Sequence, residues 1–240
     1  VVLLEISDIN SWKQFFDVIY DSSNIIELKL DQDKCKISLL NNSHVAFYDV
    51  EYSKDFFDTY QIDGAESVLV FVEDFYKILK SSNKGDVMTL QSDDAHLKIV
   101  FENESNRRVF ELPLGDDYGQ SPIPPSIDYD GSFMVSLEDL KAPVNDLDKI
   151  VKTDRFKMSL GDGSLIVLSP NDSMTQYKQE ISIDSALNGS VTVNIGYISQ
   201  LLKLSKINKT VEFKIGDNIP LSWNISSPME DVKVSGLIAP

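Results

Sequence analysis

Residues 72–101 read VEDFYKILKSSNKGDVMTLQSDDAHLKIVF, a lysine-bearing stretch in which two kinds of hydrophobic spacing follow one another. Its first part has helical spacing, with Phe75, Ile78 and Leu79 as apolar positions. A polar turn follows, and two short apolar runs, 87–90 and 97–101, then flank a turn that contains aspartates. Short apolar runs between polar turns are typical of β-strands. The stretch therefore predicts a helix followed by two strands.

The same order of elements occurs again in residues 195–225, which read IGYISQLLKLSKINKTVEFKIGDNIPLSWNI. The match lies in the pattern and not in residue identity. Each half of the chain gives a strand, a helix, a group of strands, a second helix and a closing group of strands. Self-similarity of this kind indicates an internal duplication, so we predict two similar domains.

A helix is also predicted near the start of each half. The first begins at Asp8, a suitable N-cap, and places Trp12, Phe15, Phe16 and Ile19 on one apolar face.

The helix in the second half is predicted from Ser136 to about Ile150. Asp139 follows Ser136 by three residues, as in a variant of the capping box, although Pro143 disfavours regular first turns. The four predicted helical segments are 8–20, 72–84, 136–150 and 195–206. Strands are predicted over 1–6, 25–30, 34–39, 45–51, 68–71, 87–90, 97–101, 107–112, 156–160, 165–168, 176–183, 191–194, 211–215, 221–225 and 232–237. These elements indicate an α+β fold in which two helices of each domain pack on antiparallel sheets.

A linker separates the two halves. Residues 114–131, LGDDYGQSPIPPSIDYDG, contain three prolines, three glycines and several acidic residues. Proline fixes φ and removes a backbone donor, so we expect an extended connection there. The predicted organisation is a first domain over 1–114, a connecting loop over 115–131 and a second domain over 132–240.

The composition is typical of a globular protein without a membrane-spanning segment. The chain has 240 residues, of which 42% are apolar and 25% charged, and no apolar run approaches the roughly 18 residues that span a bilayer. The first six residues are too short an apolar run for a signal peptide. Cys35 is the single cysteine, which fits a reducing compartment, and we expect an intracellular protein.

The net charge of −16 argues against binding nucleic acid unless the basic residues are gathered on one surface. Taken over 8–20, 72–84, 136–150 and 195–209, the helical segments hold nine lysines and eight acidic residues, while the remainder holds 13 basic and 30 acidic residues. Solvated faces of amphipathic helices also carry lysines. Two lysine clusters at corresponding places of a repeat nevertheless favour a phosphate-binding surface. It would be independent of sequence, because no aromatic or arginine-rich reading element accompanies the lysines.

No constellation for catalysis or metal binding is evident. Cys35, His44 and His96 do not share ligand spacing, and the acid pairs at 93–94 and 116–117 are typical of solvated turns. The GDGS at 161–164 is typical of a hairpin turn rather than a phosphate loop. We therefore expect no enzymatic activity, no cofactor and no metal.

Three stretches carry a resemblance to a known family. They are LLNNSHVAFYDVEY (39–52), with its Ser-His-Val before a strand, DNIPLSWNI (217–225) and the terminal LIAP (237–240). Together with the linker and the repeat, they resemble the proliferating cell nuclear antigen (PCNA) type of DNA sliding clamp found in archaea and eukaryotes. The resemblance covers essentially the whole chain.

The resemblance implies a DNA clamp fold and a ring, usually a homotrimer, whose helices line a central hole and whose sheets form the outer wall. Such a ring encircles duplex DNA without sequence preference and is a processivity factor, not an enzyme. It tethers DNA polymerase, and the clamp loader, nucleases and ligases of replication and repair dock on it through short peptide motifs. The resemblance also implies a cytoplasmic, nucleoid-associated protein, or a nuclear one in a eukaryote.

The resemblance also assigns residues to three surfaces. The DNA surface would contain Lys13, Lys77, Lys80, Lys84, Lys141, Lys203, Lys206 and Lys209. The groove for partner peptides would contain Leu40, His44, Val45, Phe47, Ile123, Pro124, Pro220, Leu237, Ala239 and Pro240, with its apolar residues exposed. The subunit interface would pair the edges 107–112 and 175–181 through Val109, Glu111, Tyr177 and Gln179.

The chain departs from the family pattern in several places. Gly236 stands where a bulkier residue is common, which predicts a shallower groove, and arginine is scarce. The family's acidic tail after Ala-Pro is missing and the first residue is Val1, so we expect trimmed ends. Two alternatives remain open. The first is an acidic protein-binding regulatory module or clamp-like subunit that does not encircle DNA alone. The second is an α+β hydrolase, which the absence of a nucleophile or metal constellation disfavours.

Overall fold

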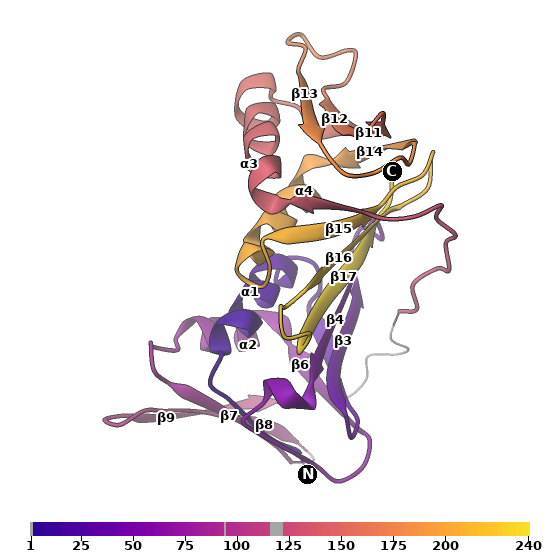
Figure 1. The fold of residues 1–240 in the computed structure, drawn as a ribbon. Helices are drawn as coiled ribbons and strands as arrows, with labels where there is room; N and C mark the ends of the chain where they lie inside the picture. The colour runs from indigo at the N-terminus through magenta and orange to yellow at the C-terminus, as the bar shows by residue number, and fades with distance from the viewer. Residues whose placement is uncertain (1, 94, 116–121) are drawn as a thin grey trace. The chain divides into compact units, whose positions relative to one another are not determined.

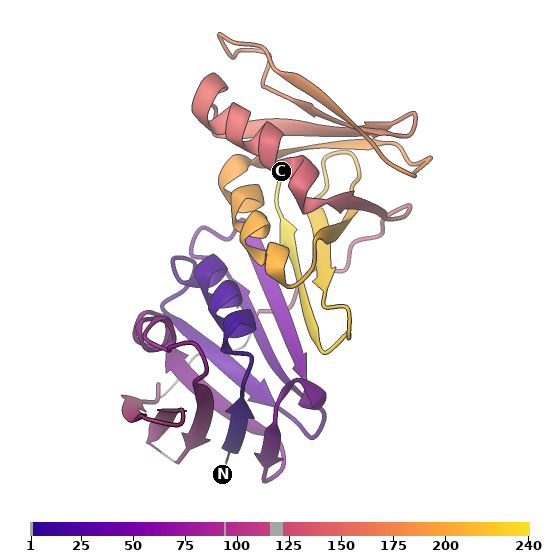
Figure 2. The same ribbon diagram turned by 60° about the vertical axis from the view of Figure 1, so that its left-hand side comes forward.

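The structure is a computed structural model that describes residues 2–93, 95–115 and 122–240. It divides into two compact units (Figures 1 and 2). Unit one consists of Val1–Asn42, Tyr48–Ile123 and Ser226–Val234, and unit two of Ser43–Phe47, Pro124–Ile225 and Ser235–Pro240. Each unit contains a short segment from the other half of the sequence. The predicted division into two continuous domains, with boundaries at 114 and 132, does not describe this exchange. Residues 116–121 of the predicted connecting loop lie outside the described residues.

The order of elements repeats along the chain, as predicted. Each half runs from a strand through a helix and a group of strands to a second helix and a closing group of strands. Helices of both halves accompany antiparallel strands, so the predicted α+β class is confirmed. No helix of the described residues is long and apolar enough to cross a membrane.

Unit one contains helices α1 and α2, which pack side by side. Its strands form the sheet β5-β1-β7-β8-β9 and the row β6-β2-β3-β4. The bounds are α1 Ile9–Ile19, α2 Val72–Lys80, β1 Val2–Ile6, β2 Ile25–Leu30, β3 Lys34–Leu40, β4 Ala46–Ser53, β5 Thr59–Ile62, β6 Glu66–Phe71, β7 Val87–Ser92, β8 His96–Glu102 and β9 Arg107–Pro113. A 3-10 turn covers Lys54–Phe56.

Packed aromatic side chains form the centre of unit one. Trp12 of α1 stacks on Tyr52 of β4 with ring centroids 5.3 Å apart, and Phe16 lies 5.0 Å from Phe75 of α2. All four side chains are buried. The apolar face predicted for α1 therefore joins this helix both to a strand and to α2, since buried aromatic rings contribute large contact areas.

Unit two contains the side-by-side helices α3 and α4, the sheet β13-β12-β11-β14 and the row β10-β15-β16. The bounds are α3 Leu137–Asp146, α4 Ile195–Leu202, β10 Phe133–Ser136, β11 Arg155–Gly161, β12 Ser164–Leu168, β13 Lys178–Ser182, β14 Gly189–Asn194, β15 Thr210–Lys214 and β16 Leu221–Ser226. The last strand, β17 (Val232–Ile238), begins in a segment of unit one and ends in a segment of unit two. A π-helical turn, Leu147–Val151, continues α3, and a 3-10 turn, Lys203–Lys206, continues α4.

The helix ends differ in detail from the predicted ones. Asp8 occupies the N-cap of α1 but caps no backbone N–H, whereas the Ser136 hydroxyl accepts the N–H of Glu138. Pro143 is accommodated inside α3, where it is buried, so it does not disturb the first turns. The helix α2 ends at Lys80, which leaves Lys84 beyond it.

Candidate nucleic-acid interface and docking surfaces

The predicted DNA-binding lysines of unit one lie on or just after α1 and α2. Lys77 and Lys80 are exposed on α2, and Lys84 is exposed in the following turn. Lys13 of α1 is half-buried and donates to the Ser82 carbonyl at 3.2 Å. Burial and, second, repulsion from Lys80 lower the pKa of Lys13. Lys77 and Lys80 therefore belong to the helix, whereas Lys84, which was predicted within the helical segment 72–84, does not.

Carboxylates already neutralise part of this surface. Lys77 donates to Glu73 at 2.5 Å, which raises the pKa of the ammonium and lowers that of the carboxyl. Lys80 lies 3.3 Å from Asp17, and hydrogen bonds with Tyr76 and then Asp17 raise its pKa. Both ion pairs are exposed to solvent and are weak, so a phosphate could replace either carboxylate.

Aromatic side chains lie beside these lysines, contrary to the prediction that none accompanies them. Tyr20 at the end of α1 stacks on Tyr76 of α2, with ring centroids 4.9 Å apart and planes 15° from parallel. The Lys80 ammonium lies over the Tyr76 ring at 5.4 Å from its centroid. The signal in the sequence is weak, because the two tyrosines are 56 positions apart and only the packing of α1 against α2 brings them together.

The predicted lysines of unit two lie on α3, on the turn after α4 and before β15. Lys141 is exposed on α3 and donates to Glu138 at 2.5 Å. Lys203 and Lys206 are exposed in the 3-10 turn that continues α4, and Lys209 is exposed just before β15. Since α3 and α4 pack together, lysines from both helical segments belong to one pair of helices, as in unit one.

In each unit, a strand that was predicted to form the subunit interface lies at the edge of a sheet. β9 is an edge of the five-stranded sheet, where Val109 is 45% exposed and Glu111 is exposed. β13 is an edge of the four-stranded sheet and contains Gln179. Tyr177 precedes it, exchanges backbone and side-chain hydrogen bonds with Ser169, and donates its hydroxyl to Gln179 at 2.6 Å. The predicted edge 175–181 is therefore shorter as a strand than expected.

Eight of the ten predicted groove residues belong to unit two. They are His44, Val45, Phe47, Pro124, Pro220, Leu237, Ala239 and Pro240. The Ala239 N–H donates to the Val45 carbonyl at 2.8 Å, so the C-terminus and the Ser-His-Val segment lie side by side. The Pro220 carbonyl accepts from Tyr129 at 2.6 Å.

The exposure of the groove residues is uneven. Ile123 is 89% exposed, and Pro124, Pro240 and His44 are exposed, the last with a left-handed φ of 59°. Val45, Pro220, Leu237 and Ala239 are half-buried, as is Leu40, which with Ile123 belongs to unit one. Phe47 is only 6% exposed, so the prediction that it is an exposed apolar residue is wrong. Its carbonyl faces Gly236 and its side chain belongs to the core.

The comparison with known proteins shows similarity to sliding clamps over the length of the chain. A sequence model described as proliferating cell nuclear antigen, N-terminal domain, matches residues 4–115. The DNA polymerase sliding clamps of Methanothermobacter thermautotrophicus and Methanobrevibacter smithii are 26% and 28% identical, and each alignment covers 98% of this chain and 96% of the relative. Residues 4–115 match the N-terminal domain of proliferating cell nuclear antigen, and the whole chain is similar to PCNA-type sliding clamps.

Solved structures of this family have the same fold as the chain. The PCNA2–PCNA3 complex of Sulfolobus tokodaii has a chain with a TM-score of 0.88 at 21% identity, covering 99% of this chain and 98% of its own. The proliferating cell nuclear antigen of Thermococcus kodakaraensis reaches the same TM-score at 16% identity with full coverage of both chains. At these identities the likeness shows the fold alone.

Gly236 departs from the PCNA pattern for a reason that packing explains. A Cβ atom on Gly236 would lie 2.4 Å from the Phe47 carbonyl oxygen and 2.6 Å from the Trp223 ring. Real Cβ atoms do not approach other atoms so closely, so the large indole of Trp223 occupies the room that a side chain would need. In this part of unit two, the Trp223 ring therefore fills the space that a side chain at position 236 would occupy.

The residues considered for chemistry have ordinary structural places. Cys35 is fully buried in β3, and burial raises the pKa of its thiol to about 12, which keeps it protonated. His96 is exposed, with Nδ1 3.8 Å from Asp93. Asp94, Asp116 and Asp117 of the acid pairs lie outside the described residues. GDGS forms the tight turn between β11 and β12, with Asp162 and Gly163 at positive φ, as predicted.

Proposed function

We propose that this chain is a sliding clamp that closes into a homotrimeric ring around duplex DNA and tethers DNA polymerase to its template. The observation that carries the proposal is the pair of edge strands, β9 in unit one and β13 in unit two. Two different edges on one chain allow head-to-tail contacts between identical copies, and such contacts close into a ring when the rotation fits. Pairing would also remove two exposed edges that invite aggregation.

The helices supply the proposed DNA surface. Both helix pairs expose lysines, and no arginine lies among the eight predicted DNA contacts. Flexible ammonium groups bind phosphates without reading bases. Where a carboxylate already pairs with the lysine, as Glu73 does with Lys77, a phosphate gains little by replacing it. A surface of many weak contacts suits a ring that must move along DNA.

The proposed groove for partner peptides lies where the C-terminus meets the Ser-His-Val segment. Half-buried apolar side chains beside exposed polar ones are typical of an interaction site. DNA polymerase, clamp loader, nuclease and ligase are its proposed occupants, each through a short peptide. The ring would act as a non-enzymatic tether on the DNA inside the cell, in replication and repair.

Light scattering coupled to size exclusion tests the ring. We expect a mass near three times 27.0 kDa for the wild type and near one chain for Val109→Asp. The exposed Val109 lies on the edge, so a charge there disturbs pairing without creating a cavity. A control, Val87→Asp, places the same charge at an exposed valine of the inner strand β7 and should leave the trimer intact. A wild-type monomer at micromolar concentration would contradict the proposal.

A second candidate is an acidic protein-binding module that does not encircle DNA alone. The ion pairs of Lys77, Lys80 and Lys141 favour it, because they reduce the positive charge available to phosphates. A monomeric wild type that binds no DNA at low salt would support this candidate.

A further inference from the structure

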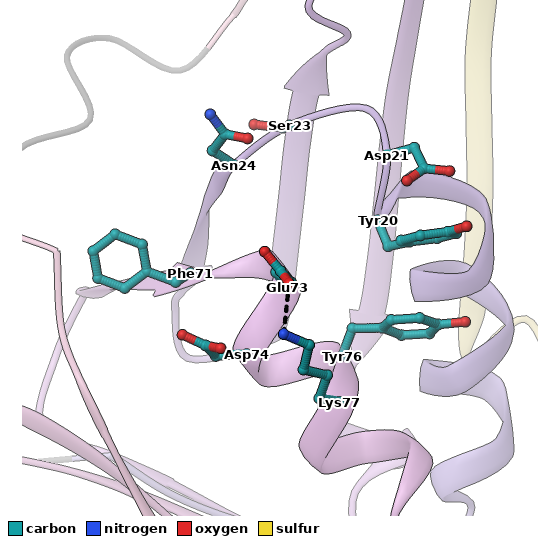
Figure 3. A pocket seen from close by; sticks show the side chains of 9 residues that line it. All are labelled: Tyr20, Asp21, Ser23, Asn24, Phe71, Glu73, Asp74, Tyr76 and Lys77. Carbon is teal, nitrogen blue, oxygen red and sulfur yellow. Dashed lines mark hydrogen bonds and ion pairs between the residues drawn. The ribbon is translucent and has the colours of Figure 1, made fainter.

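A pocket of about 590 Å³ opens in unit one where the end of α1 meets the beginning of α2. Figure 3 shows Phe71 on one side of it, the stacked Tyr20 and Tyr76 on the other, and acidic residues of α2 between them. Phe71 is 37% and Tyr20 40% exposed, so both present apolar ring surface to solvent. This pocket is not part of the predicted peptide groove or of the interface edges.

The charge of the pocket is unlike that of a phosphate-binding site. Asp21, Glu73 and Asp74 contribute three carboxylates to its lining and Lys77 contributes the single ammonium. Lys77 is already paired with Glu73. Within the described part of the chain, neither Asp21 nor Asp74 forms an ion pair with a cation. DNA phosphates would be repelled here, even though the neighbouring lysines favour DNA.

The aromatic stack already binds a cation of the chain itself. The Lys80 ammonium lies 5.4 Å from the centroid of Tyr76, the distance range of a cation–π contact. The Tyr76 hydroxyl is anchored by Asp17, while a hydrogen bond with Asp21 raises the pKa of the Tyr20 phenol. Both rings are therefore held in place, and Tyr20 still exposes ring surface beside a carboxylate.

From this combination we infer that the pocket binds an arginine side chain of a partner protein. A guanidinium is planar, stacks on aromatic rings and pairs with two carboxylate oxygens at once. Asp21 and Asp74 supply the negative charge, and Tyr20 and Phe71 supply the ring surface. The inference goes beyond the proposed clamp function and does not require a ring, because every lining residue belongs to unit one.

Calorimetry with the peptide acetyl-Gly-Arg-Arg-Gly-amide on the full chain tests the inference. The double variant Asp21→Asn, Asp74→Asn should weaken binding about fivefold, since each exposed charge pair contributes modestly. The variant Tyr20→Leu, Phe71→Leu keeps the charge and should weaken binding by a similar factor because it removes the rings. The same peptide with citrulline in place of arginine should bind poorly to the wild type.

The control must separate this site from the general attraction of an acidic protein for a cationic peptide. Glu104→Gln with Asp172→Asn removes two exposed charges that do not line the pocket, and it should change the affinity by no more than about twofold. Thermal unfolding verifies that all variants are folded. Equal weakening by the two charge variants, or equal affinity for the arginine and citrulline peptides, overturns the inference.

Discussion

Asp86 is a buried carboxylate that secures the edge strand β9. It accepts hydrogen bonds from the Asn83 N–H at 2.8 Å, from Asn103 at 2.5 Å and from Arg108 of β9 at 2.6 Å. Arg108 also donates to the Ser81 carbonyl at 2.8 Å, at the end of α2. Burial by itself raises the pKa of Asp86, but the three donors outweigh it and hold the pKa below its ordinary value.

A prediction about acid stability follows from this lowered pKa. Stabilisation by the ionised Asp86 is fully present above the unfolded pKa of about 3.9 and is lost as the pH falls through the folded pKa. We expect Asp86→Asn to lower the free energy of unfolding by about 2 kcal/mol at neutral pH. Below about pH 4 the difference from wild type should shrink, and urea unfolding at a series of pH values measures it.

The control for this experiment is Asp172→Asn, because Asp172 is exposed in the loop between β12 and β13. Its pH profile should coincide with that of the wild type. A constant difference between Asp86→Asn and wild type across the acid range would contradict the linkage.

Residue-scale features of the candidate site could be predicted only where they depend on local sequence. The exposed lysines and the Asp-Gly turn are of this kind. The burial of Phe47 and the need for glycine at position 236 could not be predicted in this way. Gly236 lies against the Phe47 carbonyl and the Trp223 ring, and Phe47 and Gly236 are nearly 200 positions apart in the sequence. No spacing rule reports such contacts.

At the scale of elements, the spacing of apolar residues along the sequence predicted most strands and all four helices. The strands β5 and β10 were missed because each has only four residues, too few for a clear alternation. The end of α2 was set four residues too late because Ser81 to Lys84 are polar and compatible with a helix surface. In the structure the Ser81 hydroxyl binds the Ile78 carbonyl and competes with further helical hydrogen bonds.

The two edge strands allow a prediction of how subunits pair. The alternation of β9 places Arg107, Val109 and Glu111 on one face, and β13 places Lys178 and Glu180 on its exposed face. In an antiparallel pairing that keeps these faces together, placing Val109 opposite Ser182 would bring Glu111 against Glu180. Like charges directly opposite one another are unfavourable, so this register is disfavoured.

We expect the register that places Val109 opposite Lys178. It brings Arg107 opposite Glu180 and Phe110 opposite Tyr177, an ion pair and an aromatic pair. The variant Val109→Cys, Lys178→Cys should form a covalent trimer on mild oxidation, visible on a non-reducing denaturing gel. The native Cys35 is buried and gives no background.

The matched control is Val109→Cys, Glu180→Cys, which shifts one cysteine by two positions on the same face. Efficient cross-linking of this pair and not of the first would show that the register is displaced by two residues. Failure of both pairs in a folded trimer would contradict both of these registers.

At the scale of the whole molecule, the charge distribution decides between a clamp and an acidic binding module. The chain carries a net charge of −16, yet its helical segments are nearly neutral. The family likeness established the fold, but residue contacts with DNA stay predictions because each lysine is weak alone and several are paired with carboxylates.

The decisive variant combines Lys77→Ala, Lys80→Ala and Lys203→Ala. All three lysines are exposed on helical segments, so the trimer should remain, while primer extension on a long template should give shorter products. The dependence of DNA affinity on salt should weaken by about one unit of slope for each lysine that contacts a phosphate. A second triple variant, with alanine at 29, 157 and 233, removes the same charge from exposed strand positions and should extend primers like the wild type. If both variants behaved alike, the effect would come from net charge. If the helix variant kept full processivity and the wild-type salt slope, the helices would not face DNA, and the acidic binding module would become the better account of this chain.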